Sequence, residues 1–272
     1  MIDQIFAATK GPTVEETFEF ALQHQMGIEL SSFYTVENLV NSQPLVQQYQ
    51  AMFKNYTGSI SIHGPIYDLN VVSLDPDIAE ISERRYIQAI NVAKALQAKY
   101  LVFHTQWTPI YPTAGISDFW TQTLVSFWRR IVETHLEGSN LTVVIENFMD
   151  QSPETLVALL SAVDSPHLKA CLDIGHVNLF SNHTILEWVK QLNNQMAYIH
   201  AHNNWSKLDS HNGFDDGSMD LDAFLTHLID MPHRVDLAIE TNSIESLSIS
   251  YALTQSYLQR QNKLVASKSF LI

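Results

Sequence analysis

The chain has 272 residues, of which 46% are hydrophobic and 16% are charged, a composition typical of globular proteins and unlike that of disordered ones. Its 29 acidic and 15 basic residues give a formal net charge of -14, which disfavours a surface that binds nucleic acid. The length fits one domain over residues 1–272. No apolar run reaches the roughly 18 residues that cross a bilayer, and no basic and apolar leader follows Met1, so we expect a cytoplasmic protein.

Short apolar segments alternate with longer amphipathic ones along the chain. The short segments, which we predict to be strands, lie at residues 4–9, 27–31, 59–63, 100–105, 142–147, 169–175, 196–202 and 235–241. Because no long linker rich in Gly, Pro or Ser separates them, the alternation indicates parallel strands joined by crossover helices. Eight such strands favour a closed barrel over an open sheet, so we predict an α/β fold of the (β/α)8 TIM-barrel type.

Several helices have recognisable starts. Thr13, followed by Glu16 in the third position after it, predicts a capping box. Ser152 before Pro153 predicts a helix that the serine caps and that has the proline at its first position. Apolar residues recur at helical spacing over residues 78–96, with charged residues on the opposite side.

Two kinds of side chain are assigned to packing. Cys171 is the single cysteine and lies in an apolar strand, so we interpret it as a core residue and not as a reactive thiol. An aromatic run at helical spacing is interpreted as core or inter-helix packing and not as a cofactor site: Phe119, Trp120, Phe127 and Trp128.

The active sites of TIM barrels lie at the C-terminal ends of the strands. Side chains that can bind a metal end six of the predicted strands or follow them closely: His63, His104, Glu146, Asp173 with His176, His202 with Asp209 and His211, and Glu240. Each alone has a simpler explanation, such as a structural histidine, a capping aspartate or a solvated turn. Their joint occurrence at the same end of consecutive strands predicts a metal centre, since imidazole and carboxylate ligands suit zinc or manganese.

Other polar and aromatic residues flank these positions. His200 points the same way as His202 but lies one pleat deeper, which predicts a supporting or substrate-contacting role. Trp107 and Trp205 in the rim loops form either an apolar wall for substrate or ordinary loop packing. The candidate substrate-binding residues are Trp107, His200 and Lys207. The remaining histidines fall on helices or distal loops and are interpreted as surface residues: His24, His135, His167, His183, His227 and His233.

Two segments resemble a known family. The sequence Tyr-Ile-His-Ala-His-Asn-Asn from Tyr198, with Asp209-Ser-His211 and Gly-Ser-Met-Asp from Gly217, resembles the seventh-strand signature of the xylose isomerase-like barrel superfamily. The sequence Ser-Ile-His-Gly-Pro-Ile-Tyr-Asp-Leu-Asn from Ser61 resembles its third-strand segment. The superfamily includes endonuclease IV, which acts on abasic sites in DNA, and many sugar and sugar phosphate isomerases and epimerases.

This resemblance implies two alternative metal sites. The endonuclease IV pattern implies a first zinc on His63, His104 and Glu146, a second, bridged by Glu146, on Asp173, His202 and Glu240, and a third on His176, Asp209 and His211. The sugar epimerase pattern implies one ion on Glu146, Asp173, His202 and Glu240, with the glutamates Glu146 and Glu240 also acting as acid and base. The resemblance thus implies one to three divalent ions.

Two departures bear on the substrate. The first two strand segments do not resemble the early segments of endonuclease IV, whose loops help to grip DNA, and Asn203 and Asn204 stand where the seventh-strand signature has an acidic residue. Only Lys10 and Lys207 fall in the predicted loops above the barrel mouth, whereas a duplex binder makes about 6 to 10 phosphate contacts. A small polar substrate is therefore expected in preference to nucleic acid.

We accordingly predict a metal-dependent isomerase or epimerase of a small sugar or sugar phosphate that works by proton transfer. The alternative is a multinuclear zinc phosphoesterase of the endonuclease IV type, and a third hypothesis is a metal-bearing binding barrel without catalysis. The oligomeric state stays open.

Overall fold

The computed structural model describes residues 2–9, 13–108, 110, 115, 117–229 and 231–269. Eight parallel strands pair in chain order and close into a barrel, which confirms the (β/α)8 fold predicted from the sequence. The strands are β1 (Ile2–Thr9), β2 (Gly27–Leu30), β3 (Ile60–His63), β4 (Tyr100–His104), β5 (Thr142–Glu146), β6 (Leu168–Asp173), β7 (Met196–Ala201) and β8 (Val235–Thr241).

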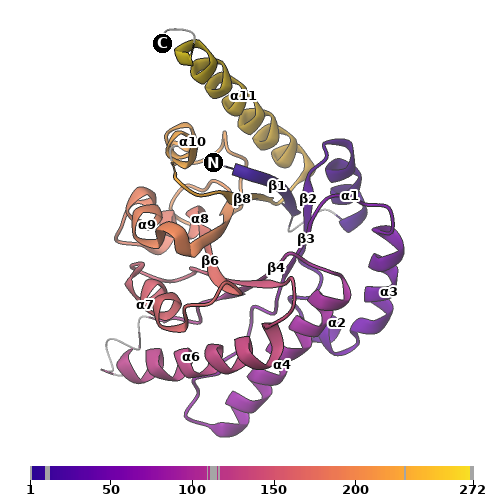
Figure 1. The fold of residues 1–272 in the computed structure, drawn as a ribbon, viewed down its shortest axis with the longest axis vertical. Helices are drawn as coiled ribbons and strands as arrows, with labels where there is room; N and C mark the ends of the chain where they lie inside the picture. The colour runs from indigo at the N-terminus through magenta and orange to yellow at the C-terminus, as the bar shows by residue number, and fades with distance from the viewer. Residues whose placement is uncertain are drawn as a thin grey trace.

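Helices surround the barrel on its outside (Figure 1). They are α1 (Val14–Gln23), α2 (Val36–Val40), α3 (Ser42–Met52), α4 (Pro76–Ala95), α6 (Ser117–Ile131), α7 (Glu154–Val163), α8 (Ile174–Phe180), α9 (Ile185–Leu192), α10 (Leu221–Ile229) and α11 (Ile244–Ser269). A π-helical turn at Val132–Leu136 follows α6, and a 3-10 turn at Asn193–Gln195 precedes β7. Helix α11 extends away from the ring of helices. No helix in the described part of the chain is long and apolar enough to cross a membrane.

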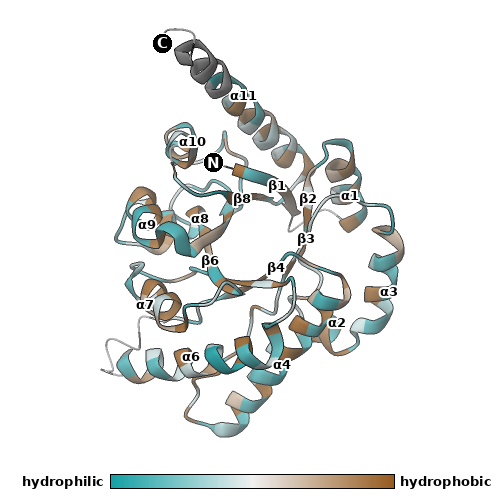
Figure 2. Cartoon of the chain, in the orientation of Figure 1, coloured by the Kyte–Doolittle hydropathy of each residue, from teal (hydrophilic) through white to brown (hydrophobic). Residues whose placement is uncertain are grey.

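The outer core lies between the strands and the helices. Hydrophilic and hydrophobic bands alternate along α4, α6 and α9 (Figure 2), as expected of helices with one face on the barrel. Phe103 of β4 packs against Tyr86 of α4, with ring centroids 4.3 Å apart, and both face Trp128 of α6. The aromatic run in α6 is therefore confirmed as packing, except at Phe119, which is 47% exposed because it lies on the outer side of the helix.

A second, smaller core fills the inside of the barrel. Its members alternate along the strands with residues of the outer core, as side chains on opposite faces of a strand must: Phe6, Ala8, Tyr100, Val102, Val144, Cys171, Tyr198 and Ala238. The edge of the Phe6 ring meets Tyr198, and Tyr100 stacks on Tyr198 with ring centroids 4.7 Å apart. Cys171 is fully buried here, which confirms it as a core residue.

The ends of several elements follow from their capping. Thr13 and Glu16 form the predicted capping box at α1. Asp75 caps α4, which begins at Pro76, two residues before the predicted start at residue 78. The prediction that strand six reaches residue 175 was wrong, because the carboxylate of Asp173 accepts the backbone N–H of His176 and starts helix α8 directly after the strand.

The predicted cap of α7 was also wrong. Pro153 takes the cap position with helical backbone angles, φ -74° and ψ -15°, and the helix begins at Glu154. The Ser152 hydroxyl hydrogen-bonds the carboxylate of Glu154, which lowers the pKa of that carboxyl, and makes no capping bond to the backbone.

Phe6 provides a test of the inner core. Its ring lies against Gly27, where an added Cβ would come within 2.5 Å of the ring, so the ring fits because residue 27 has no side chain. We expect Phe6→Ala to lower the free energy of unfolding by about 3–5 kcal/mol, since it leaves a cavity between fixed strands. Chemical denaturation measures the loss. The control Leu22→Ala, at a side chain 55% exposed, should change it by less than about 0.5 kcal/mol.

Candidate metal centre at the mouth of the barrel

The structure brings together all nine side chains that the sequence singled out as metal ligands. They lie where the strands end, in overlapping groups whose possible ligand atoms are all within 4.8 Å of one another. The first group is His63, His104 and Glu146, the second is Asp173, His202 and Glu240, and the third is His176, His202, Asp209 and His211. A further group of Glu146, Asp173 and His176 overlaps all three. Whether each binds a metal stays a prediction, but their convergence is a property of the fold.

The first group joins strands β3, β4 and β5. One oxygen of Glu146, Oε2, lies 3.3 Å from His63 Nε2 and 3.5 Å from His104 Nε2. His63 Nδ1 lies 3.0 Å from the backbone carbonyl of Gly64, an acceptor, so Nδ1 carries the proton and Nε2 presents a lone pair to the group. A hydrogen bond of this kind fixes the tautomer of metal-binding histidines.

The second group depends on the start of helix α8. Asp173 ends β6, and both its backbone N–H and its carbonyl are held at 2.9 Å by the side-chain amide of Asn147. His202 Nε2 lies 3.3 Å from Asp173 Oδ1. Gly175 makes this approach possible, because a Cβ there would come within 2.0 Å of the His202 ring. The local sequence Asp-Ile-Gly-His thus has a steric reason for its glycine.

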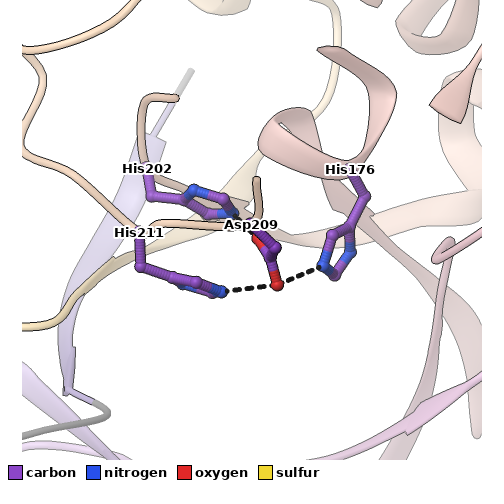
Figure 3. Close-up of side chains that lie close together, drawn as sticks. All are labelled: His176, His202, Asp209 and His211. Carbon is purple, nitrogen blue, oxygen red and sulfur yellow. Dashed lines mark hydrogen bonds and ion pairs between the residues drawn. The ribbon is translucent and has the colours of Figure 1, made fainter. Parts of the chain in front are cut away.

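The third group has Asp209 at its centre. Its Oδ2 lies 3.1 Å from His211 Nε2 and 3.5 Å from His176 Nε2. Dashed lines mark both contacts in Figure 3. His202 stacks on His211 with ring centroids 3.9 Å apart. The backbone of His211 is left-handed, with φ 49°, a conformation uncommon for a residue other than glycine and found disproportionately at functional sites.

The electrostatics keep the carboxylates ionised. Burial alone would raise the pKa of the Glu146 carboxyl, but His104 and His200 outweigh it and hold that pKa well below its ordinary value. Burial would likewise raise the pKa of Asp209, yet the hydrogen bonds of His176 and His211 lower it far below the usual range. Burial also lowers the pKa of His104, which favours the neutral imidazole that binds metals.

Two observations test whether a metal fits these groups. Glu146 Oε2, Asp173 Oδ2 and His202 Nε2 are buried and have no hydrogen-bond partner among the described residues, which is costly unless a cation satisfies them. Moreover, a tetrahedral zinc with bonds of about 2.0–2.1 Å separates its ligand atoms by about 3.3 Å. The separations of 3.1 to 3.5 Å around Glu146 and Asp209 match that value. The residues present therefore fit a divalent metal.

Sequence reasoning missed Glu29. This residue is nearly completely buried on β2, and its carboxylate lies 3.1 Å from His200 Nε2. The signal was present, since Glu29 is a single acidic residue within the apolar segment Gly-Ile-Glu-Leu. His200 itself has no exposed surface, and its role, supporting or in contact with substrate, stays a prediction.

The remaining expected residues lie around the mouth with different degrees of exposure. Trp107 is half-buried against the outer core, whereas Lys207 is exposed. Trp205 is 56% exposed and donates a hydrogen bond to Asp216, as ordinary loop packing would. Lys10 falls outside the described residues. The six histidines interpreted as surface residues are half-buried, and none belongs to the groups at the mouth.

Asn203 and Asn204, which depart from the family signature, are both buried and organise the loop after β7. Asn203 donates to the carbonyl of Phe214 within this loop. Asn204 donates to the carbonyl of Gly175 and so connects the loop to helix α8. Amide side chains suit this role because each offers a donor and an acceptor at once.

A small cavity opens beside the metal groups. It has a volume of about 180 Å³ and is lined by Ser31, Tyr34, His63, Ile66, Tyr67 and Glu240. Pockets for drug-sized ligands occupy about 300–1,000 Å³, so this one suits a small molecule. A larger cavity of about 560 Å³ lies at the other end of the barrel, around Ile60 and Lys99, far from the strand ends that carry the ligands.

The family model described as xylose isomerase-like TIM barrel matches residues 21–259. The chain therefore belongs to the xylose isomerase-like TIM barrel family, as the strand-end motifs indicated. Among curated proteins, it is similar to the uncharacterized protein MJ1311 of Methanocaldococcus jannaschii, with 26% identity over 222 residues that cover 78% of this chain and 74% of the relative.

Two solved structures are similar over nearly the whole chain. A D-tagatose 3-epimerase-like protein superposes with a TM-score of 0.80 at 22% identity, covering 97% of this chain and 100% of that one. The TTHB071 protein from Thermus thermophilus, soaked with ZnCl2, has a TM-score of 0.75 at 21% identity, covering 94% of this chain and 98% of that one. At these identities the likeness establishes the fold.

The ion count tests the metal centre. We expect metal-free protein titrated with Zn²⁺ to saturate at more than one ion per chain, because the ligand groups are complete. Replacing both Asp209 and His211 with alanine should lower the count by one, since only the third group depends on both. Elemental analysis after gel filtration measures the stoichiometry, and His183→Ala, outside the groups, is the control. An unchanged count in the double variant would contradict the assignment of the third group.

Proposed function

We propose that this protein is a divalent-metal-dependent isomerase or epimerase of a small sugar. The observation that carries the proposal is the placement of Glu146 and Glu240. They come from β5 and β8, on different sides of the barrel, yet their carboxylates lie 3.4 and 3.1 Å from the same atom, His200 Nδ1. Two glutamates that face one point, beside a cavity for a small molecule, suit the transfer of a proton to and from one substrate carbon.

The chemistry follows from this arrangement. A divalent ion held by Glu146, Asp173, His202 and Glu240 would polarise a substrate oxygen and acidify the neighbouring C–H. One glutamate takes the proton from that carbon. In an epimerase, the other glutamate returns a proton to the same carbon from the opposite side and so inverts its configuration. In an isomerase, the proton goes instead to the former carbonyl carbon while the hydroxyl proton passes to the former carbonyl oxygen, so the carbonyl moves to the deprotonated carbon. Zinc or manganese is the proposed ion, because one imidazole and three carboxylates suit either, and the zinc-soaked protein of the same fold supports zinc.

The surroundings favour a neutral sugar over a phosphorylated one. The aromatic rings of Tyr34 and Tyr67 line the cavity next to Glu240, and such rings pack well on the apolar face of a sugar. Among the described residues of the loops that follow the strands, Lys207 is the one basic side chain, and it is exposed. A phosphate group would find little positive charge there apart from the metal.

A second candidate function is a multinuclear phosphoesterase. The completeness of the third group, in which Asp209 joins His176 and His211, favours it, because clustered metal ions stabilise both the attacking and the leaving oxygen of a phosphate ester. The scarcity of basic residues around the mouth disfavours a nucleic-acid substrate for this chemistry as well.

Isotope exchange tests the first function. We expect the zinc-loaded protein, incubated in D2O with a panel of neutral ketoses and their phosphates, to introduce deuterium next to the carbonyl of at least one neutral ketose. Glu146→Gln and Glu240→Gln should each lower the exchange rate by about 10²–10⁴-fold, the usual contribution of a general acid or base. The exposed Glu154→Gln is the matched control. Mass spectrometry of the recovered sugars measures the incorporation.

One outcome of these assays would contradict the isomerase or epimerase function. If no ketose in the panel exchanges, and the protein instead hydrolyses a simple phosphodiester, the second function holds. Asp209→Asn separates the two functions. An epimerase that uses only the ion on Glu146, Asp173, His202 and Glu240 should keep part of its activity, whereas a three-metal hydrolase should lose nearly all of it.

A further inference from the structure

A buried pair of side chains crosses the inside of the barrel below the metal groups. His200 lies on β7 and Glu29 on β2, two strands that are separated by β8 and β1 in the closed sheet. His200 Nε2 lies 3.1 Å from Glu29 Oε1 and is hydrogen-bonded to Glu29 Oε2 at 3.3 Å. The His200 side chain has no exposed surface and that of Glu29 is 1% exposed. The pair therefore spans the barrel in a region that solvent does not reach.

The sequence makes room for this pair with small residues. Ala8 on β1 pairs in register with both Glu29 and Glu240, and Ala238 on β8 pairs with His200. Both alanines belong to the inner core, so their side chains point into the barrel beside the pair. A larger side chain at either position would occupy the space through which His200 reaches β2.

The far end of the pair is also fixed. Ser61 Oγ, on the neighbouring strand β3, donates a hydrogen bond of 2.8 Å to Glu29 Oε2. Ser61 and Glu29 are register partners across β2 and β3. One carboxylate oxygen of Glu29 thus accepts the hydrogen bond of Ser61, and both oxygens lie close to His200 Nε2. These contacts leave the carboxylate little rotational freedom.

The other ring nitrogen of His200, Nδ1, lies close to the proposed acid and base, Glu146 and Glu240. His200 Nδ1 lies 3.1 Å from Glu240 Oε2 and 3.4 Å from Glu146 Oε2. The imidazole ring is rigid, so the position of Nδ1 follows from the position of Nε2. A rotation of the ring that moved Nε2 away from Glu29 would also withdraw Nδ1 from both glutamates.

We propose that Glu29 is a positioning residue of the metal centre. By holding Nε2 of His200, it fixes Nδ1 between Glu146 and Glu240 and so sets the orientation in which both carboxylates meet the metal. This inference rests on the metal centre of the proposed function and not on its substrate. Outer partners of metal ligands typically change metal affinity by about 10–100-fold when they are removed, which sets the size of the expected effect.

Two substitutions at one position separate orientation from charge. Glu29→Leu fills the space but accepts no hydrogen bond, whereas Glu29→Gln keeps an acceptor for His200 and loses the charge. We expect Zn²⁺ affinity, measured by competition with a chelator, to fall by about 10–100-fold in Glu29→Leu and by less than about threefold in Glu29→Gln. The visible absorption spectrum of the Co²⁺-loaded protein should change in Glu29→Leu alone, because it reports ligand geometry.

Asp236→Asn is the matched control. Asp236 is a buried carboxylate on β8 that pairs with Lys99 at 2.5 Å at the opposite end of the barrel. Its replacement should lower the melting temperature without changing Zn²⁺ affinity or the Co²⁺ spectrum. A loss of metal affinity in this variant equal to that in Glu29→Leu would show a general effect of barrel stability and overturn the proposal.

The pathway through His200 is tested by a double variant. In a His200→Asn background, Glu29→Leu should cause no further loss of metal affinity, because the residue through which Glu29 acts on the two glutamates is already absent. Wild-type affinity in Glu29→Leu overturns the proposal, and so does a loss in Glu29→Gln as large as that in Glu29→Leu, since charge would then explain it. Should Glu29→Leu fail to fold, Ser61→Ala decides: a several-fold loss supports the proposal and an unchanged affinity overturns it. All readouts omit substrate, so absence of isomerase activity leaves them intact.

Discussion

The crowding of carboxylates and imidazoles at one end of the barrel is the constraint on which the rest of the structure depends. Taking a charged group out of water costs several kcal/mol even after relaxation, and here several such groups share one buried site. They tolerate one another because histidines stand between the carboxylates and because the ligand atoms are spaced as a cation requires. The apolar inner core around Phe6 and Tyr198 packs tightly inside the barrel below these groups and supports them.

Much of this arrangement could be predicted from the sequence because the strands are short and end sharply. A polar residue that ends an apolar run lies at the barrel mouth whatever the details of packing, so His63, His104 and Glu146 could be assigned by position alone. The loop pair Asp209 and His211 could be included as possible ligands because the loop follows β7, but their separate ion was implied only by the family resemblance. Glu29 could be noticed as a single acidic residue in an apolar strand, but its role could not be assigned, since that role depends on a partner on β7, far along the chain.

The errors at element ends come from residues that are compatible with two neighbouring boundaries. A hydrogen bond decides the boundary at Asp173, whereas at Pro153 the proline itself takes the cap position. At Asp173 the capping bond to His176 ends the strand two residues early. The same bond places the carboxylate beside His202, so the shift in the boundary is part of the construction of the site.

The double use of Asp173 also bears on how this site can change over evolutionary time. One carboxylate both starts helix α8 and belongs to the proposed metal groups, so its loss would remove a helix cap and a proposed ligand together. Serine, threonine and asparagine cap helices nearly as well but bring no negative charge. Under the proposed function, a descendant that lost its metal would keep its barrel most readily by one of these exchanges, and the residue at this single position would record whether the lineage still binds a cation.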